Sequence, residues 1–203
     1  MMSRKPRRFT RRIGERSYRK LFLIAAEGAK TEPQYFSMFN SRQATVQVTC
    51  LKCGHDSAPP QVLKRMTTWL KKNGLKDSDE AWLVVDKDQW TDAQLMELHL
   101  WAQSKGNYGF ALSNPKFEYW LLLHFEEGKG VQSSRQCSER LRQHLPYYDK
   151  GIDLRKFTPD SISRAVHRAE LRDTPPCTDW PRTTGTTVYR LVEQLIPSEF
   201  FNP

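Results

Sequence analysis

The sequence predicts an α/β fold, in which helices flank a parallel sheet and a helical, loop-rich segment follows. Short apolar runs alternate with helical patterns between residues 20 and 125, an order typical of parallel strands joined by right-handed crossovers. Residues 126–203 contain helical patterns and loop residues instead. With 203 residues, 38% of them hydrophobic, the chain is long enough for one well-cored domain, which we place at 20–203.

The first strand and helix are expected between residues 20 and 40. The apolar run LFLIAA ends at Glu27 and Gly28, which suits a buried strand followed by a tight turn. In the TEPQ sequence that follows, the threonine can cap a helix, the glutamine can complete a capping box, and the proline is tolerated in the first turn. A helix is therefore expected to begin near Thr31.

Three further strands are predicted from periodicity. The alternating sequence TVQVTCL (45–51) predicts the second strand, and an amphipathic helix over residues 61–74 should follow it. Residues 80–85 predict the third strand, after which a helix should start at Thr91. Residues 108–112 predict the fourth strand. The order of strand and helix is thus maintained throughout this half of the chain.

The later helices are marked by their first residues. Asn114 is expected to cap, and Pro115 to begin, the aromatic helix KFEYWLLLHF. A second helix should run from Thr158-Pro159 to Arg172. The segment 184–196 predicts a last helix that can pack on the sheet.

Acidic residues follow the first and third strands. In an extended segment, the side chains of Asp86 and Asp88 would leave the same face about 7 Å apart, with Lys87 on the other face. Strands of a parallel sheet end on one edge, so Glu27 should lie close to both aspartates. Oxygen ligands of this kind suit Mg²⁺, with Mn²⁺ as a substitute. The alternative is that these acids cap helices or lie in solvated loops.

Three neighbouring carboxylates should repel one another and raise a pKa. We therefore expect Glu27 to exchange a proton with an attacking or leaving oxygen, while the two aspartates stay ionised on the metal. This constellation predicts a site for metal-dependent phosphoryl transfer.

The positive charge is concentrated at the start of the chain. Of the formal net charge of +9, residues 1–20 contribute nine basic residues and one acid, or +8. We expect residues 1–19 to form a disordered arm whose cations contact nucleic-acid phosphates, or else a solvated leader without a specific role. The candidate contact residues are Arg4, Arg7, Arg8, Arg11 and Arg12.

The four cysteines do not predict a disulfide scaffold, and reduced thiols are expected. Cys50 and Cys53, with His55 nearby, can begin a zinc site or simply end a strand. No run approaches the roughly 18 apolar residues of a membrane span, and the first residues lack the apolar part of a signal peptide. We therefore expect a soluble, cytoplasmic protein that does not bind membranes.

Four segments carry a family resemblance: IAAEGAKTEPQYF, VVDKDQW, SNPKFEYWLLLHF and TTVYRLVEQL. Together they resemble the RloB family, a branch of the Toprim-like proteins, over residues 20–196. The resemblance implies a Rossmann-like, Toprim-type α/β domain whose glutamate and D-x-D motif bind magnesium. It also implies a link with restriction and phage-defence loci, often beside an AAA or ABC-type ATPase.

The family pattern maps onto Glu27, Asp86 and Asp88, and its N-P-x-F-E-x-W stretch maps onto Asn114, Pro115, Phe117, Glu118 and Trp120. Glu118 can be a fourth acid of the site or can pair with the helix dipole. His124 is expected to be a hydrogen-bonded core residue. Phe117 and Trp120 belong to a stripe that faces the core.

Three lysines lie next to the predicted acids in the sequence. Lys30, Lys87 and Lys116 can hold a scissile phosphate or simply solvate a turn or helix start. The leading functional hypothesis is a magnesium-dependent nuclease that acts on RNA, including tRNA, or on DNA. The alternatives are a non-catalytic sensor or toxin subunit and an RNA-binding protein that depends on the arm. For the protein in any of these roles, both a monomer and a homodimer stay open.

Overall fold

A five-stranded sheet with strand order β2-β1-β3-β4-β5 forms the centre of the molecule. The computed structural model describes residues 19–41, 44–53, 58–88 and 90–196. β1 to β4 are parallel to one another, and β5 is antiparallel to β4. The strands are β1 (Lys20–Ala26), β2 (Val46–Cys50), β3 (Glu80–Asp86), β4 (Tyr108–Asn114) and β5 (Gly185–Thr186).

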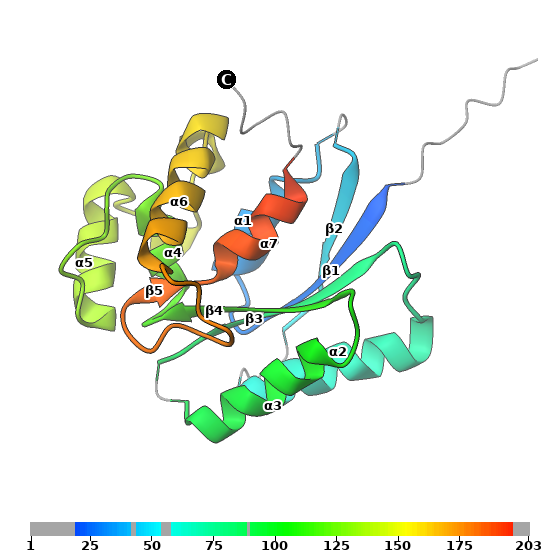
Figure 1. Ribbon diagram of the computed structural model, residues 1–203. Coiled ribbons are helices and arrows are strands. Elements are labelled where there is room, and N and C mark those ends of the chain that lie inside the picture. The colour runs from blue at the N-terminus through cyan, green and yellow to red at the C-terminus, as the bar shows by residue number, and fades with distance from the viewer. Residues whose placement is uncertain (1–18, 42–43, 54–57, 89, 197–203) are drawn as a thin grey trace, which may run out of the picture.

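Helices cover both faces of the sheet in a Rossmann-like arrangement, as predicted (Figure 1). They are α1 (Thr31–Ser37), α2 (Pro59–Asn73), α3 (Asp92–Gln103), α4 (Phe117–Leu123), α5 (Ser134–His144), α6 (Pro159–Arg172) and α7 (Val188–Leu195), with short 3₁₀ turns η1 (Tyr148–Lys150) and η2 (Leu154–Lys156). Within the described residues, no helix has both the length and the apolar character that a bilayer crossing requires.

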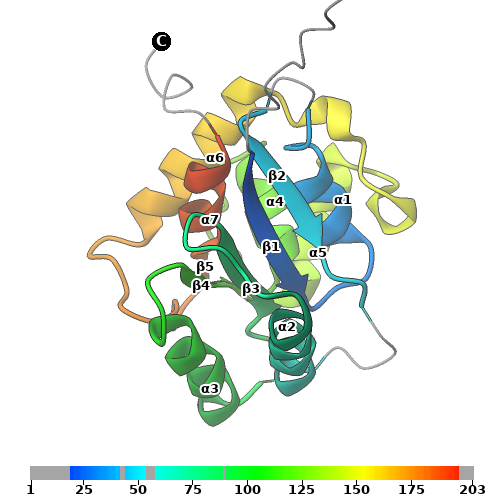
Figure 2. The same cartoon turned by 90° about the vertical axis from the view of Figure 1, so that its right-hand side faces the viewer.

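Two hydrophobic clusters separate the layers. α2 and α3 pack on one face of the sheet, where Val62 and Leu95 meet alternate residues of β1 and β3 such as Leu23 and Leu83. The other helices lie on the opposite face, over residues such as Phe22 (Figure 2). This division follows from the strand periodicity, because successive side chains point to opposite faces.

Most predicted elements are confirmed, and so are two of the predicted helix starts. The four strands lie where the apolar runs placed them. At α3, Thr91 and Gln94 form a reciprocal capping box. At α6, the Thr158 side chain accepts a hydrogen bond from the Ser161 amide.

The predicted caps of α1 and α4 are wrong. Lys30 occupies the cap of α1, and the Gln34 side chain instead accepts a hydrogen bond from the backbone of Ile152, far along the chain. Asn114 ends β4 and donates to the Pro181 carbonyl, so α4 begins two residues later than predicted, at Phe117. In both cases a tertiary contact takes the side chain that local rules assign to the cap.

The last predicted helix begins later than residue 184. Gly185 and Thr186 pair with Asn114 and Ser113 of β4, and the Thr186 and Ser113 hydroxyls are 2.8 Å apart. The Thr187 amide continues this contact by donating to the Leu112 carbonyl. Branched threonines favour strands. The C-terminal segment therefore adds an edge strand before α7, which packs on the sheet as expected.

Candidate functional site

Glu27 follows β1 at the carboxyl edge of the sheet and is held there by both of its oxygens. Its Oε2 accepts a hydrogen bond from the Asp86 amide (3.1 Å), and its Oε1 accepts one from the Trp90 indole (3.0 Å). Burial raises the pKa of Glu27, and the charge of Asp88 adds to this, whereas the two hydrogen bonds oppose it. The carboxylate of Glu27 thus joins the ends of β1 and β3.

Asp86 is the last residue of β3 and faces the start of α4. Its Oδ1 accepts a hydrogen bond from the Phe117 amide at 2.8 Å. Burial raises the pKa of Asp86 well above its usual range, and the charges of Glu32, Glu27 and Glu118 raise it further. Asp86 is therefore the point at which the acids of three elements converge.

Glu32 is the most buried acid of this group, with only 5% of the residue exposed. It lies in the first turn of α1, and its Oε1 accepts a hydrogen bond from the Gly28 amide at 2.9 Å. A Cβ at position 28 would lie 2.1 Å from Glu32 Oε2, so this close approach requires glycine. Burial raises the pKa of Glu32 to about 7, and Glu118 and Glu27 contribute to the increase.

Glu118 completes the group from the first turn of α4. Its side chain is 18% exposed, and the Lys116 ammonium lies 3.9 Å from its Oε1. Lys116 also donates to the Ser138 hydroxyl at 2.6 Å. We call Glu27, Glu32, Asp86 and Glu118 the acidic cluster.

The structure does not bring Asp88 into line with Asp86. β3 ends at Asp86, and Asp88 is exposed with a φ of 24°, so the extended geometry expected for the D-x-D motif is wrong. The Asp88 amide instead donates to the Pro115 carbonyl at 3.0 Å. The turn leaves Asp88 near enough to influence Glu27 but on the outer side of the cluster.

The other predicted cations lie in different surroundings. The Lys87 ammonium donates to the Trp90 carbonyl (2.7 Å) and to Asp92 (2.9 Å), at the start of α3 and away from the acidic cluster. Lys30 is exposed at the cap of α1. Arg4, Arg7, Arg8, Arg11 and Arg12 lie outside the described residues.

His124 is a core residue, as predicted. It is buried, its Nε2 is 3.1 Å from the Tyr35 hydroxyl, and its Nδ1 is 3.1 Å from the Trp120 carbonyl oxygen. Burial lowers the pKa of His124 to about 3, so the ring is neutral at physiological pH. Phe117 and Trp120 are buried in the same cluster.

A family model now bears on the identity of the chain. The model described as RloB-like protein matches residues 22–195, which include every member of the acidic cluster. The chain belongs to the RloB-like family. Comparisons with curated proteins and with solved structures found no match.

In this RloB-like protein, the donor chemistry of the acidic cluster suits a hard divalent cation such as Mg²⁺. The geometry is looser than that of a closed site, because no group of three or more His, Cys, Asp or Glu side chains in the described part of the chain is placed to hold a metal ion. Glu27 uses both oxygens, and Asp86 uses one, in hydrogen bonds to the protein. Asp86 and Glu118 are therefore the residues that fit such an ion, with water supplying further ligands.

Sequence reasoning assigned no role to two residues of this site. Glu32 stands five positions after Glu27, in the first turn of a helix that starts at the same sheet edge. This position could have identified Glu32 as a neighbour of Glu27. Trp90 reaches Glu27 from the segment before α3, and nothing in the local sequence pattern indicates that contact. Cys50 ends β2, which was the alternative to a zinc site for the cysteine pair. The Cys53 thiol donates to the Glu27 carbonyl at 3.3 Å, and His55 lies outside the described residues.

Proposed function

We propose that this protein is a metal-dependent nuclease that hydrolyses phosphodiester bonds of RNA, tRNA included, or of DNA. The observation that carries the proposal is the convergence of four carboxylates from β1, α1, β3 and α4 at one sheet edge. Backbone amides connect them, since Asp86 donates to Glu27 and Phe117 donates to Asp86. Ligands of open α/β sheets bind at the carboxyl ends of the strands, which is where this cluster lies.

The cellular setting of the proposal comes from family membership. We place the protein in a prokaryotic anti-phage defence or restriction-linked system, acting with an AAA or ABC-type ATPase. This part rests on the RloB-like match and on the resemblance to Toprim-like proteins, and the acidic cluster is compatible with it.

Each residue of the acidic cluster has a proposed task. Asp86 and Glu118 would hold Mg²⁺ or Mn²⁺, with Asp88 at the outer side. When bound, such an ion lowers the pKa of a water and neutralises charge on the phosphate. Glu27 fixes the Asp86 backbone through its hydrogen bond, and Lys116 supplies positive charge beside Glu118.

We assign proton exchange to Glu32 rather than to Glu27. Both oxygens of Glu27 accept N–H donors, which favours its ionised form. Glu32 accepts backbone amides, but its deeper burial outweighs them. With a pKa of about 7, Glu32 can gain and lose a proton at neutral pH. An acid with this property is suited to general acid-base catalysis.

The proposal is tested by nuclease assays of the full chain and of Asp86→Asn, with Mg²⁺ and with chelator, on RNA and DNA substrates. We expect cleavage that requires the metal and falls by about 100-fold or more in Asp86→Asn. Glu97→Gln is the matched control, because Glu97 is an exposed carboxylate on α3, and it should retain activity. Equal cleavage by wild type and Asp86→Asn would contradict the assigned site.

A second candidate is a non-catalytic subunit that binds nucleic acid or an ATPase partner. The loose spacing of the acids in the described part of the chain favours it. In that case the purified protein, alone and with its ATPase, should bind nucleic acid without metal-dependent cleavage. Cleavage that disappears in Asp86→Asn would exclude this candidate.

A further inference from the structure

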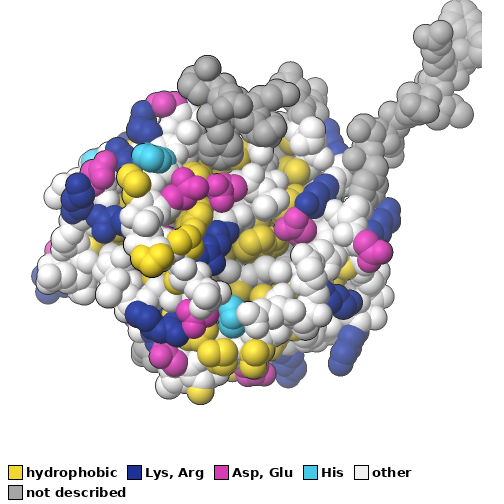
Figure 3. Space-filling model, in the orientation of Figure 1, with side chains coloured by type: hydrophobic (Ala, Val, Ile, Leu, Met, Phe, Trp, Pro, Cys, Tyr) yellow, Lys and Arg dark blue, Asp and Glu magenta, His cyan; other side chains and the backbone are white. Residues whose placement is uncertain are grey.

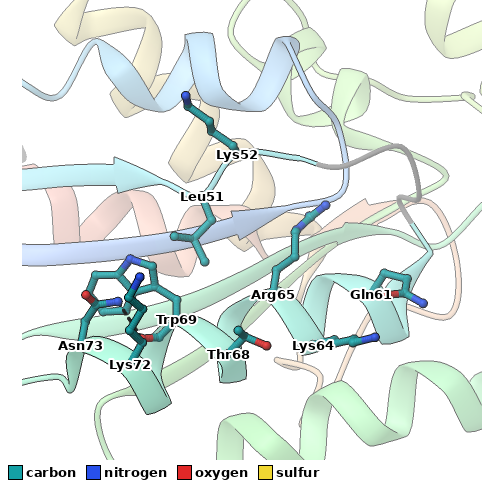
Figure 4. A pocket seen from close by; sticks show the side chains of 9 residues that line it. All are labelled: Leu51, Lys52, Gln61, Lys64, Arg65, Thr68, Trp69, Lys72 and Asn73. Carbon is teal, nitrogen blue, oxygen red and sulfur yellow. Dashed lines mark hydrogen bonds between the residues drawn. The ribbon is translucent and has the colours of Figure 1, made fainter.

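A second charged region lies beside the acidic cluster, in a groove between α2 and the segment that follows β2. The groove is a cavity of about 630 Å³ (Figure 4). Leu51 and Lys52 border it on the strand side, and residues of α2 form the other wall. Among the described residues, its lining includes four basic side chains and no acidic one. We call this cavity the α2 groove.

The cations and the aromatic ring of α2 are regularly spaced. Lys64 and Lys72 are eight residues apart, which is two i,i+4 steps and about 12 Å along one side of the helix. Arg65 and Trp69, which are four residues apart, form a neighbouring row on the helix. Trp69 is half-buried, and Figure 4 shows its side chain rising from α2 towards Leu51. The wall therefore offers positive charge and an indole surface along the same length of helix.

Arg65 connects the α2 groove to the acidic cluster. Its guanidinium donates to the Ala26 carbonyl and lies 3.0 Å from the Cys53 sulfur. Ala26 directly precedes Glu27, and the positive charge of Arg65 opposes the increase in the pKa of Glu27 that burial causes. A chain lying in the groove would thus reach the carboxylates at its Arg65 end.

On the face of the molecule that Figure 3 shows, basic and acidic side chains are interspersed and separated by hydrophobic ones. A groove whose described lining has cations and an aromatic ring but no acids suits a polyanion with flat apolar groups. Single-stranded nucleic acid has this chemistry, because its phosphates pair with cations and its bases stack on aromatic rings.

We propose that the α2 groove binds a single-stranded segment of nucleic acid, with Lys64 and Lys72 contacting phosphates and Trp69 stacking on a base. Arg65 directs the bound strand towards the acidic cluster. This inference rests on the proposed function only in naming nucleic acid as the substrate, and it specifies that the segment near the carboxylates is single-stranded. Duplex nucleic acid would present its stacked bases poorly to Trp69.

The test measures binding of fluorescent single-stranded DNA and RNA oligonucleotides to the full chain, in chelator and over a range of salt concentrations. The double variant Lys64→Ala/Lys72→Ala should reduce the slope of log affinity against log salt by about 1.4, or about 0.7 for each lost phosphate contact. Trp69→Ala should weaken binding about 5- to 150-fold, the range for base stacking on an aromatic ring. Trp69→Tyr, which keeps a ring, should restore most of the affinity.

Lys71→Ala is the matched control, because Lys71 is an exposed lysine on the same helix that does not line the groove. It should leave affinity and salt slope close to wild type. The proposal is overturned if Lys71→Ala weakens binding as much as Lys64→Ala/Lys72→Ala does. It is also overturned if duplex, or an acidic polypeptide, competes as well as the single strand and Trp69→Ala has no effect.

The binding test is independent of cleavage. Because no metal is present, the assay reports binding by the wild-type protein and the groove variants without cleavage. Normal binding through the α2 groove without metal-dependent cleavage would refute the nuclease and support the groove. Metal-dependent cleavage by the wild type, together with unchanged binding in the groove variants, would support the nuclease and refute binding in the α2 groove.

Discussion

Two buried acids in this molecule have pKa values that are shifted in opposite directions. Asp173, after α6, is 8% exposed, and Glu32 at the sheet edge is 5% exposed. Asp173 accepts hydrogen bonds from the Cys177 amide (2.9 Å), the Tyr189 hydroxyl (2.9 Å) and Arg190 (2.6 Å). Burial alone would raise the pKa of Asp173, but these donors hold it below its usual value. Glu32 accepts hydrogen bonds from backbone amides, its own and that of Gly28, but burial still raises its pKa to about 7.

The difference indicates what each acid is for. Asp173 and Arg190 join α6 to α7, so their ion pair holds the C-terminal helices together. The acidic cluster instead places Glu32 beside Glu27 and Glu118, whose negative charges disfavour its ionised form. Carboxylates that are buried from water and lie close to other carboxylates lower the stability of the folded state. Such groups concentrate at functional sites. The comparison therefore supports a structural role for Asp173 and is consistent with the catalytic role proposed for Glu32.

The largest expected effect is on activity, and it tests the role given to Glu32. Glu32→Gln keeps the size of the side chain and removes the titrating proton. If Glu32 exchanges a proton during hydrolysis, turnover should fall about 10²- to 10⁴-fold, and the limb of the pH–rate profile that reports its titration should disappear. The measurement is the rate of metal-dependent cleavage from pH 5 to 9. Full activity with an unchanged pH–rate profile would show that Glu32 does not exchange a proton in the reaction.

The next effect is on stability, and it tests the role given to Asp173. Arg190→Met keeps part of the stem but leaves Asp173 without its cation. An unpaired buried carboxylate should lower the free energy of unfolding by about 3 to 5 kcal/mol, measured by urea denaturation at pH 7. Arg164→Met is the matched control, because the Arg164–Asp160 pair on α6 is exposed and should contribute about 0 to 1 kcal/mol. Equal effects of the two substitutions would show that the Asp173 cluster has no special structural role.

The sequence predicts the scaffold well where periodicity determines it. β1 to β4 and the helices α2, α3 and α6 follow from apolar spacing and from local caps such as Thr91. β5 was missed because two residues carry no periodicity, and its pairing depends on Ser113 and Thr186 meeting across the sheet. Short strands stabilised by a distant partner leave little trace in the local sequence.

The site was predicted in part for the same reason. Strand ends placed Glu27 and Asp86 at one edge, and the start of α4 placed Glu118 there. The D-x-D spacing suggested an extended pair, but the chain turns at Asp88, where φ is 24°. Burial of Glu32 depends on the close approach of Gly28 and on neighbouring helices, which the spacing of residues does not reveal. Convergence at the edge was therefore predictable, whereas the protonation of each acid was not.

The smallest of the three effects concerns the pH dependence of stability. For an acid whose folded pKa is raised, the folded state binds more protons than the unfolded state, so stability falls as pH rises between the two pKa values. Glu32 should therefore cost about 3 kcal/mol by pH 7.5 relative to pH 4.5, because its pKa moves from 4.5 to about 7. Glu32→Gln lacks this cost. The difference in unfolding free energy, variant minus wild type, should increase by that amount over this range.

The two clusters can be separated in one titration, because they act in different pH windows. The lowered pKa of Asp173 gives stability that is present above its unfolded value of 3.8 and is lost as pH falls below it. Measurements in chelator above pH 4.5 therefore report on the acidic cluster. The difference between the two proteins includes the change in the pKa of Asp86 that follows from loss of the Glu32 charge. A difference that stays constant from pH 4.5 to 7.5 would mean that Glu32 is ionised throughout. In that case burial and the charges of Glu27 and Glu118 would not raise the pKa of Glu32, and Glu32 would not differ from Asp173 in this respect.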